Sequence, residues 1–231
     1  MSYILGDIAS RVRLRIRDTS YSSSETIQYV NDTVNDVYNE YRLPFMETTS
    51  NGTMTALDSD IYGVATLPID YVQAIDLIIT TQGQERRLPY RDADQIAGIY
   101  PDSDDTTAHP AGQPEYWYKY ADTIRVFPTP NAAYTFTLRY YKRPALLSAN
   151  ADIPSLPSEF EELIVVGASY RIMQVKDNYD QAGILENKYD ELLQKLVSRY
   201  SQTQTGTPHT MGINRRGRYS AGLDTIHRRT G

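Results

Sequence analysis

The sequence contains no cysteine and only three histidines among its 231 residues. Without cysteine there is no disulfide framework, no thiolate zinc site and no cysteine nucleophile. The histidines lie in a loop rich in proline and glycine (His109) and in the C-terminal segment (His209 and His227), where nothing holds them beside a nucleophile. No GxSxG, HExxH, P-loop or GxGxxG pattern occurs. We therefore expect no enzyme activity, no catalytic residue, no metal and no cofactor.

Long apolar runs are also missing. No stretch reaches the roughly 18 apolar residues of a membrane span, and the N-terminus has no run of the length found in secretory signals. We expect a soluble protein that is made in the cytoplasm and does not contact a membrane. A chain of this length buries roughly 70% of its unfolded surface, so its core needs no metal or disulfide for stability.

Tyrosine and charge are distributed unusually. There are 20 Tyr against 4 Phe and 1 Trp, a choice that suits half-buried surfaces and interfaces as well as strand positions. The net charge is −6, but residues 201–231 carry five arginines against Asp224, which leaves residues 1–200 at −10. An acidic body of this kind repels a nucleic-acid backbone.

Residues 11–19 read RVRLRIRDT, which as a strand would place four arginines on one face. At about 100° per residue, a helix instead gathers the apolar residues of this region within a stripe roughly 80° wide. The stripe holds Leu5, Ile8, Val12 and Ile16 and is bordered by Arg11, Arg13, Arg15 and Arg17. The helix explains the placement of more residues than the strand does, and only Leu14 points away from the apolar stripe, or seam. We expect these arginines to form ion pairs with acidic helix faces.

Three further helices are expected. The second begins near Ser22, which has capping-box spacing to Glu25, and ends before Pro44. A third follows Ser158 as N-cap; its residues 163–173 are apolar almost all round, which predicts burial on several sides, and Gly167 would allow a neighbouring helix to approach. The last has an a/d spacing formed by Ala182, Leu185, Tyr189, Leu192 and Leu196.

Strand patterns fill residues 45–147, apart from a short helix expected near 92–100. Asn51-Gly52 predicts a hairpin turn, and three runs between 115 and 143 predict a meander with a turn at Ala121-Asp122. The fold class expected is α+β: a helical bundle of two N-terminal and two C-terminal helices with an inserted antiparallel β-rich domain and a flexible C-terminal tail. The boundaries are 1–44, 45–147, 148–200 and 201–231.

Two clusters could bind a ligand. Asp102, Asp104 and Asp105 could hold a hard cation, as a hydrolase would require, but a solvated loop is favoured because the cluster lacks the turning glycine of a calcium loop. Tyr116, Trp117, Tyr118 and Tyr120 could stack on sugars or bases. The simpler reading is that Trp117 enters the core while the tyrosines cover the opposite face of the strand.

The C-terminal segment has no sustained apolar period and is expected to be disordered in isolation. It could be a solvated tail, a nucleic-acid arm, or a segment that orders on a protein partner. Leu223 and Ile226, between arginine clusters, favour the last reading because an electrostatic arm needs no apolar anchors.

Several motifs come in an order that resembles the head-to-tail adaptor, or connector, proteins of short-tailed bacteriophages, of the tail tubular protein A type. The resemblance covers residues 1 to about 200 and is carried by RVRLRIRDT, NDTVNDV, LPIDY (67–71), PEYWYKYADTIRVFPTP (114–130), YYKRPALL (140–147) and LPSEFEELIVVGA (156–168). These are turn, strand and cap residues rather than chemistry.

The resemblance implies a virion structural protein that forms a ring of twelve subunits beneath the portal, extends the DNA channel without sequence-specific binding, and carries the nozzle or fibre proteins. It also implies that the tail reaches the portal, with portal-binding candidates Arg215, Arg216, Arg218, Leu223, Ile226, Arg228 and Arg229. The subunit-interface candidates are Arg11, Arg13, Leu14, Arg15 and Arg17. A carbohydrate-binding or fibre-attachment module of a phage tail, using the aromatics at 116–120, is the alternative hypothesis.

Overall fold

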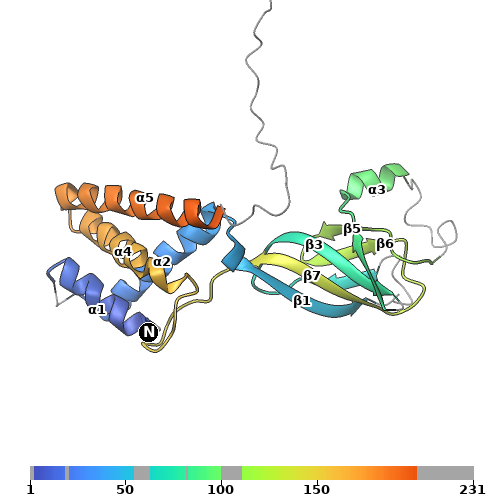
Figure 1. The fold of residues 1–231 in the computed structure, drawn as a ribbon, viewed down its shortest axis with the longest axis horizontal. Helices are drawn as coiled ribbons and strands as arrows, with labels where there is room; N and C mark the ends of the chain where they lie inside the picture. The colour runs from blue at the N-terminus through green and yellow to red at the C-terminus, as the bar shows by residue number, and fades with distance from the viewer. Residues whose placement is uncertain (1–2, 19–20, 55–62, 82, 100–110, 202–231) are drawn as a thin grey trace, which may run out of the picture.

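A computed structural model describes residues 3–18, 21–54, 63–81, 83–99 and 111–201. It confirms a mixed fold of helices and antiparallel sheets, with the long helices gathered at one end and the strands at the other (Figure 1). The helices are α1 Leu5–Arg15, α2 Ser23–Glu40, α3 Ala93–Ile99, α4 Glu161–Val175 and α5 Tyr179–Ser201, with 3-10 turns η1 Pro44–Met46 and η2 Ser158–Phe160. The strands are β1 Glu47–Met54, β2 Gly63–Thr66, β3 Tyr71–Thr81, β4 Gln84–Leu88, β5 Tyr116–Tyr120, β6 Thr123–Phe127 and β7 Tyr134–Lys142.

The first two helices form as their sequence patterns predict. The apolar seam of α1 is buried, with Leu5, Ile8 and Val12 fully covered. The cap of α2 is also confirmed, because the Glu25 backbone N–H donates to Ser22 Oγ at 3.2 Å. This bond satisfies one of the donors that a helix N-terminus leaves without an intrahelical partner.

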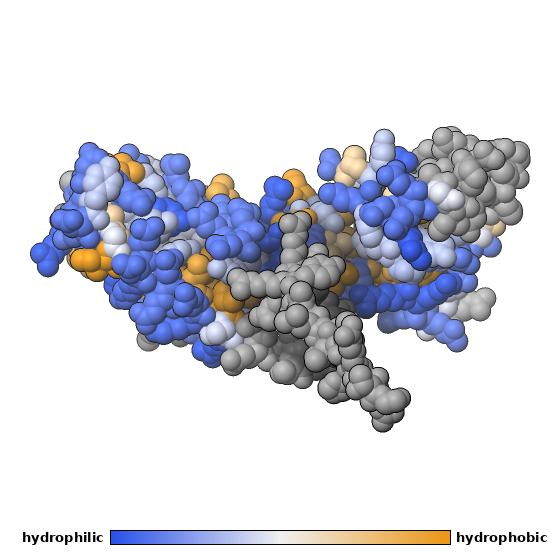
Figure 2. Space-filling model, turned by 90° about the horizontal axis from the view of Figure 1, so that it is seen from above, coloured by the Kyte–Doolittle hydropathy of each residue, from blue (hydrophilic) through white to orange (hydrophobic). Residues whose placement is uncertain are grey.

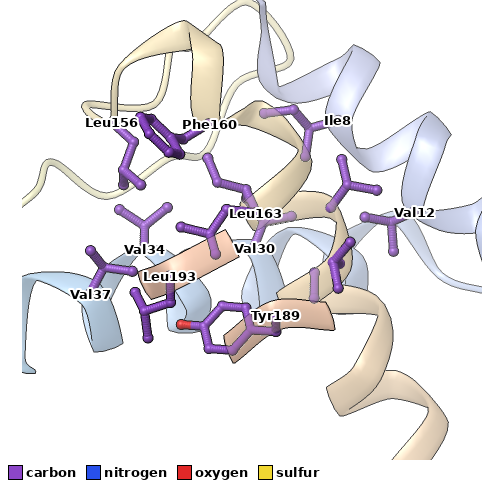
Figure 3. Close-up of a cluster of buried hydrophobic side chains, with 14 of the residues drawn as sticks. Ile8, Val12, Val30, Val34, Val37, Leu156, Phe160, Leu163, Tyr189 and Leu193 are labelled. Atoms are coloured by element: carbon purple, nitrogen blue, oxygen red, sulfur yellow. The ribbon is translucent and has the colours of Figure 1, made fainter. Parts of the chain in front are cut away.

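Helix α4 lies in the middle of the helical part, where it packs against α1, α2 and α5. Its burial on several sides is confirmed, and Figure 3 shows Leu163 among side chains from α1, α2 and α5. The prediction of Ser158 as N-cap is wrong, because Ser158 opens η2 and α4 begins after Phe160 without a side-chain cap. The seam of α5 also differs by one position, since Leu193 is buried in place of Leu192.

The strands form two antiparallel sheets, of order β1-β7-β3-β4 and β2-β6-β5. The predicted turn at Asn51-Gly52 is wrong: β1 runs straight through both residues, which pair with Thr137 and Phe136 of β7. Glycine is needed there for space rather than for a turn. A β-carbon at Gly52 would come within 2.6 Å of the Phe136 ring.

The predicted meander of β5, β6 and β7 is correct only for its first hairpin. β5 and β6 pair through a turn in which Ala121 has φ +50°. β7 then leaves for the other sheet and lies between β1 and β3. Because it pairs with strands on both sides, its alternate residues Phe136, Leu138 and Tyr140 enter the sheet core.

The short helix expected near 92–100 is present as α3. Its Ile96 packs with Tyr118 and Phe127 in a small cluster separate from the main sheet core. Trp117 enters the sheet core as expected, but Tyr118 is equally buried at 4% exposure, because α3 covers the second face of β5. The expectation that Tyr118 lies on an outer face is therefore wrong.

Candidate interaction surfaces

The arginines of α1 meet the acidic start of α4. Arg11 pairs with Glu161, and its Nη2 lies 3.2 Å from Glu162 Oε2. Arg15 Nη2 lies 2.7 Å from Glu162 Oε1, and Lys188 Nζ of α5 approaches the same oxygen at 3.0 Å. Glu162 therefore joins three helices within one chain.

The pKa of Glu162 reflects this arrangement. Partial burial is the largest single influence and would raise the pKa, but the hydrogen bonds and charges of Arg15 and Lys188 together outweigh it. The net result is a pKa below the ordinary value. Glu162 thus remains an anion that holds three cations beside the helical core.

The other candidate interface residues of α1 face different surroundings. Arg13 Nε donates to the Ala9 carbonyl at 3.4 Å, within its own helix. Leu14 is 69% exposed, as its position off the seam predicts. Arg17 follows the helix with φ +54°, a left-handed conformation at which the chain turns away. The assignment of Arg11, Arg13, Leu14, Arg15 and Arg17 to a subunit interface stays a prediction.

A shallow recess of about 420 Å³, here named the acidic recess, lies where α2, α4 and α5 meet; it is lined by Asp36, Asn39, Glu40, Tyr170, Arg171 and Tyr189. Arg171 is anchored in it by hydrogen bonds to the Gly167 carbonyl at 2.9 Å and Thr33 Oγ1 at 3.0 Å, and it pairs with Asp36. Its guanidinium also lies 4.7 Å from the centre of the Tyr170 ring.

Carboxylates outnumber cations around the acidic recess. Burial raises the pKa of Tyr170, and the charges of Asp36, Glu186 and Asp190 raise it further against the opposing effect of Arg171. Burial likewise raises the pKa of Tyr189 to about 12. The floor of the recess is thus formed by neutral tyrosine rings, and its surroundings are negatively charged.

The loop between β2 and β3, residues 67–70, presents a different surface and is here named the Ile69 loop. The Ile69 side chain is fully exposed. A recess beside it is lined by Tyr71, Val72, Lys119, Asp122 and Arg143. An apolar side chain therefore projects next to two cations and the carboxylate of Asp122, and it is followed in the loop by Asp70.

The aromatic strand β5 is not organised as a stacking platform. Trp117 is 4% exposed, and its indole Nε1 donates to the Leu88 carbonyl at 3.1 Å. Tyr120 is exposed, but the Arg125 guanidinium lies 4.2 Å from the centre of its ring. The two central rings of the carbohydrate-binding alternative, Trp117 and Tyr118, are therefore buried and not available to stack on a sugar.

Several other candidate residues lie outside the described residues. These include the acidic cluster Asp102, Asp104 and Asp105, all three histidines and the whole predicted portal-binding set from Arg215 to Arg229. Within the described ranges, no group of three or more His, Asp or Glu side chains could hold a metal ion. The same part of the chain has no helix long and apolar enough to cross a membrane.

Sequence reasoning did not single out Ile69, Arg171 or the carboxylates around the acidic recess. For Ile69 a local signal exists, since a Pro-Ile-Asp sequence between two strands places an apolar residue in a turn. For Arg171 no local signal identifies the partners that come from α2 and α5, namely Thr33, Asp36 and Tyr189. The visible surface of the helical and strand parts is mainly hydrophilic, with hydrophobic residues in small separate patches (Figure 2).

Comparison with known protein families identifies a match. A family model described as SU10 adaptor protein matches residues 3–215, which is most of the chain. No curated protein matches.

Proposed function

Because the chain belongs to the SU10 adaptor protein family of phage adaptors, we propose that it forms a ring that joins the capsid portal to the tail. The predicted resemblance to phage head-to-tail adaptors is confirmed at the level of the family. A protein of this family is a structural component of the virion and associates with other head and tail components. The match over residues 3–215 is the observation that carries the proposal.

The two-part shape supports this role. In our proposal, residues 1–44 and 148–200 form the helical bundle that builds the ring, and residues 45–147 form a β-rich domain that faces a neighbour or a tail protein. The long helices share one hydrophobic core, so the helical part can transmit load as a unit (Figure 3). The proposed ring has twelve subunits, the number that the resemblance implies.

The charge of the body supports a conduit for DNA. Residues 1–200 carry a net charge of −10, and a negatively charged wall repels phosphate, so DNA slides past it rather than binding. The proposal therefore includes no sequence-specific DNA contact. The arginine-rich residues 201–231 instead engage the portal, with Leu223 and Ile226 as apolar anchors.

The test is mass measurement of the full-length protein alone and mixed with its portal protein. We expect a closed ring, and a larger complex when the portal is added. A chain that ends at Ser201 should still form the ring but should not bind the portal. A protein that stays monomeric in both mixtures would contradict the ring, and undiminished portal binding by the shortened chain would contradict the role of the tail.

Paired variants separate the two types of contact in the tail. Leu223→Ser together with Ile226→Ser should weaken portal binding, while Thr225→Ser, between them, should leave it unchanged. If the anchors are apolar, the loss should persist at high salt, where ionic contacts are screened.

A further inference from the structure

Ile69 is held outward by a loop that has little freedom to move. The Leu67 N–H donates to the Asp122 carbonyl at 2.9 Å, and the Tyr71 N–H donates to the Pro68 carbonyl at 3.0 Å. Asp70 is fixed twice, since its carbonyl accepts from the Arg143 N–H at 2.7 Å and its carboxylate accepts from the Tyr140 hydroxyl at 2.8 Å. A fully exposed isoleucine on such a loop is preorganised for insertion into a partner, because little conformational entropy remains to be lost.

The charge beside Ile69 identifies the kind of surface that would receive it. Lys119 and Arg143 line the same recess with the carboxylate of Asp122, while the carboxylate of Asp70 in the loop is held by the Tyr140 hydroxyl. Lys119 Nζ lies 5.2 Å from the centre of the Tyr71 ring, which places this cation beside the loop. The matching surface needs an apolar floor and a negatively charged rim.

The acidic recess has both features. Tyr170 and Tyr189 line it, with the Arg171 guanidinium 4.7 Å and 5.8 Å from their ring centres, while Asp36 and Glu40 line it and are exposed. Glu186 and Asp190 act electrostatically on the same tyrosine ring, and Arg171, the cation that lines the recess, is paired with Asp36. The recess therefore complements the Ile69 loop in both polarity and charge.

We propose that the Ile69 loop of one copy of the chain docks in the acidic recess of the next copy. The loop belongs to the strand part and the recess to the helical part (Figure 1). Both lie near the junction of the two parts, since Gln73, close to the loop, accepts from Arg42 Nε at 3.3 Å just beyond α2. Each copy thus offers one donor and one acceptor surface, and a contact between two different surfaces repeats around a ring until it closes. This inference rests on the proposed ring and specifies one contact that builds it.

The absence of cysteine from the chain allows a direct test by cross-linking. Ile69→Cys and Asn39→Cys are made as separate full-length variants, mixed in equal amounts and oxidised. We expect a covalent dimer in the mixture and little in either variant alone, because only the mixture brings the two thiols together across a contact. Mixing Ile69→Cys with Ile184→Cys, at a position of α5 that is 70% exposed, is the matched control and should give little dimer.

Ring mass is measured on the same mixtures before oxidation, with the portal added if the protein alone is monomeric. A ring without the Ile69-Asn39 cross-link, or with preferential cross-linking to Ile184, overturns the docking contact but leaves the ring intact. If no ring forms under either condition, the proposed ring and the contact that rests on it both fail.

Charge reversal gives an independent measurement. Lys119→Glu and Glu40→Lys should each weaken subunit association about tenfold, since each places like charges across the contact. The double variant should recover most of the loss if these residues face each other between copies. Unchanged association in both single variants would overturn the proposal.

Discussion

Gly167 of α4 lies so close to Thr33 of α2 that a β-carbon added at Gly167 would come within 2.4 Å of the Thr33 methyl carbon. The same carbon would come within 2.8 Å of the Tyr189 ring from α5. Gly167 is therefore the point at which three helices converge, as its place in an apolar segment predicts.

Gly167→Ala should destabilise the chain by about 1–3 kcal/mol. The free-energy cost of displacing Thr33 and Tyr189 is larger than the gain in helix propensity from replacing glycine by alanine. Urea denaturation followed by circular dichroism measures the change. The control is Gly183→Ala in α5, where an added β-carbon has no neighbour within 4 Å among the described residues. That variant should gain up to about 1 kcal/mol from helix propensity alone. Equal effects at the two glycines would contradict the close approach.

Glu162→Gln should lower the free energy of unfolding at pH 7 by about 1 kcal/mol, because it removes the charge that Arg11, Arg15 and Lys188 share. The folded-state pKa of Glu162 lies below its ordinary value of 4.5. Its contribution is thus complete above the unfolded-state pKa and is lost as the pH falls through the folded-state pKa.

The difference between wild type and Glu162→Gln should accordingly shrink as the pH is lowered below about 4.5. Unfolding curves between pH 3 and pH 7, with the pH values set at about one-unit steps, measure this dependence. Glu191→Gln is the control, since Glu191 pairs with Lys195 in a single exposed contact. It should change stability little at any pH, and a pH-independent loss at Glu162 would rule out its ionised role.

The parts of the fold that were predictable depend on neighbours in sequence. The seam of α1 and the Ser22 cap follow from spacing alone, and both are confirmed. The turn at Asn51-Gly52 failed because its signal is local, whereas the requirement for Gly52 comes from Phe136, far along the chain. The prediction that Tyr118 lies on an outer face failed for the same reason, since Tyr118 is buried only because α3 packs over it in the folded chain.

The interaction surfaces show the same division. Local periodicity predicts that the α1 arginines border an apolar seam and seek carboxylates, but it cannot identify Glu162 as the residue that collects them. The acidic recess combines α2, α4 and α5, so no stretch of sequence contains it. The exposure of Ile69 depends on hydrogen bonds to β6 and β7 flanking residues, namely Asp122 and Arg143.

Arg17→Gly should stabilise the isolated chain by about 0.5–1 kcal/mol, because glycine adopts the left-handed conformation at φ +54° without the steric penalty of a side chain. Thermal unfolding of the monomer measures the gain. Arg13→Gly is the contrasting control, since it places glycine inside α1 and should cost about 1 kcal/mol. If Arg17 also contacts a neighbouring subunit, as predicted, the stabilised variant should assemble less well, which separates a functional arginine from a merely tolerated one.

Gly52→Ala should destabilise the sheet by about 1–3 kcal/mol, because the new methyl group would meet the Phe136 ring across the β1–β7 pair. Phe136→Leu alone also costs stability, since the ring is 7% exposed and belongs to the sheet core. The two changes together should cost less than their sum, because the smaller leucine leaves room for the methyl group. Denaturant unfolding of the four proteins in this cycle measures the coupling between the two sites. Strict additivity would contradict the close contact between Gly52 and Phe136.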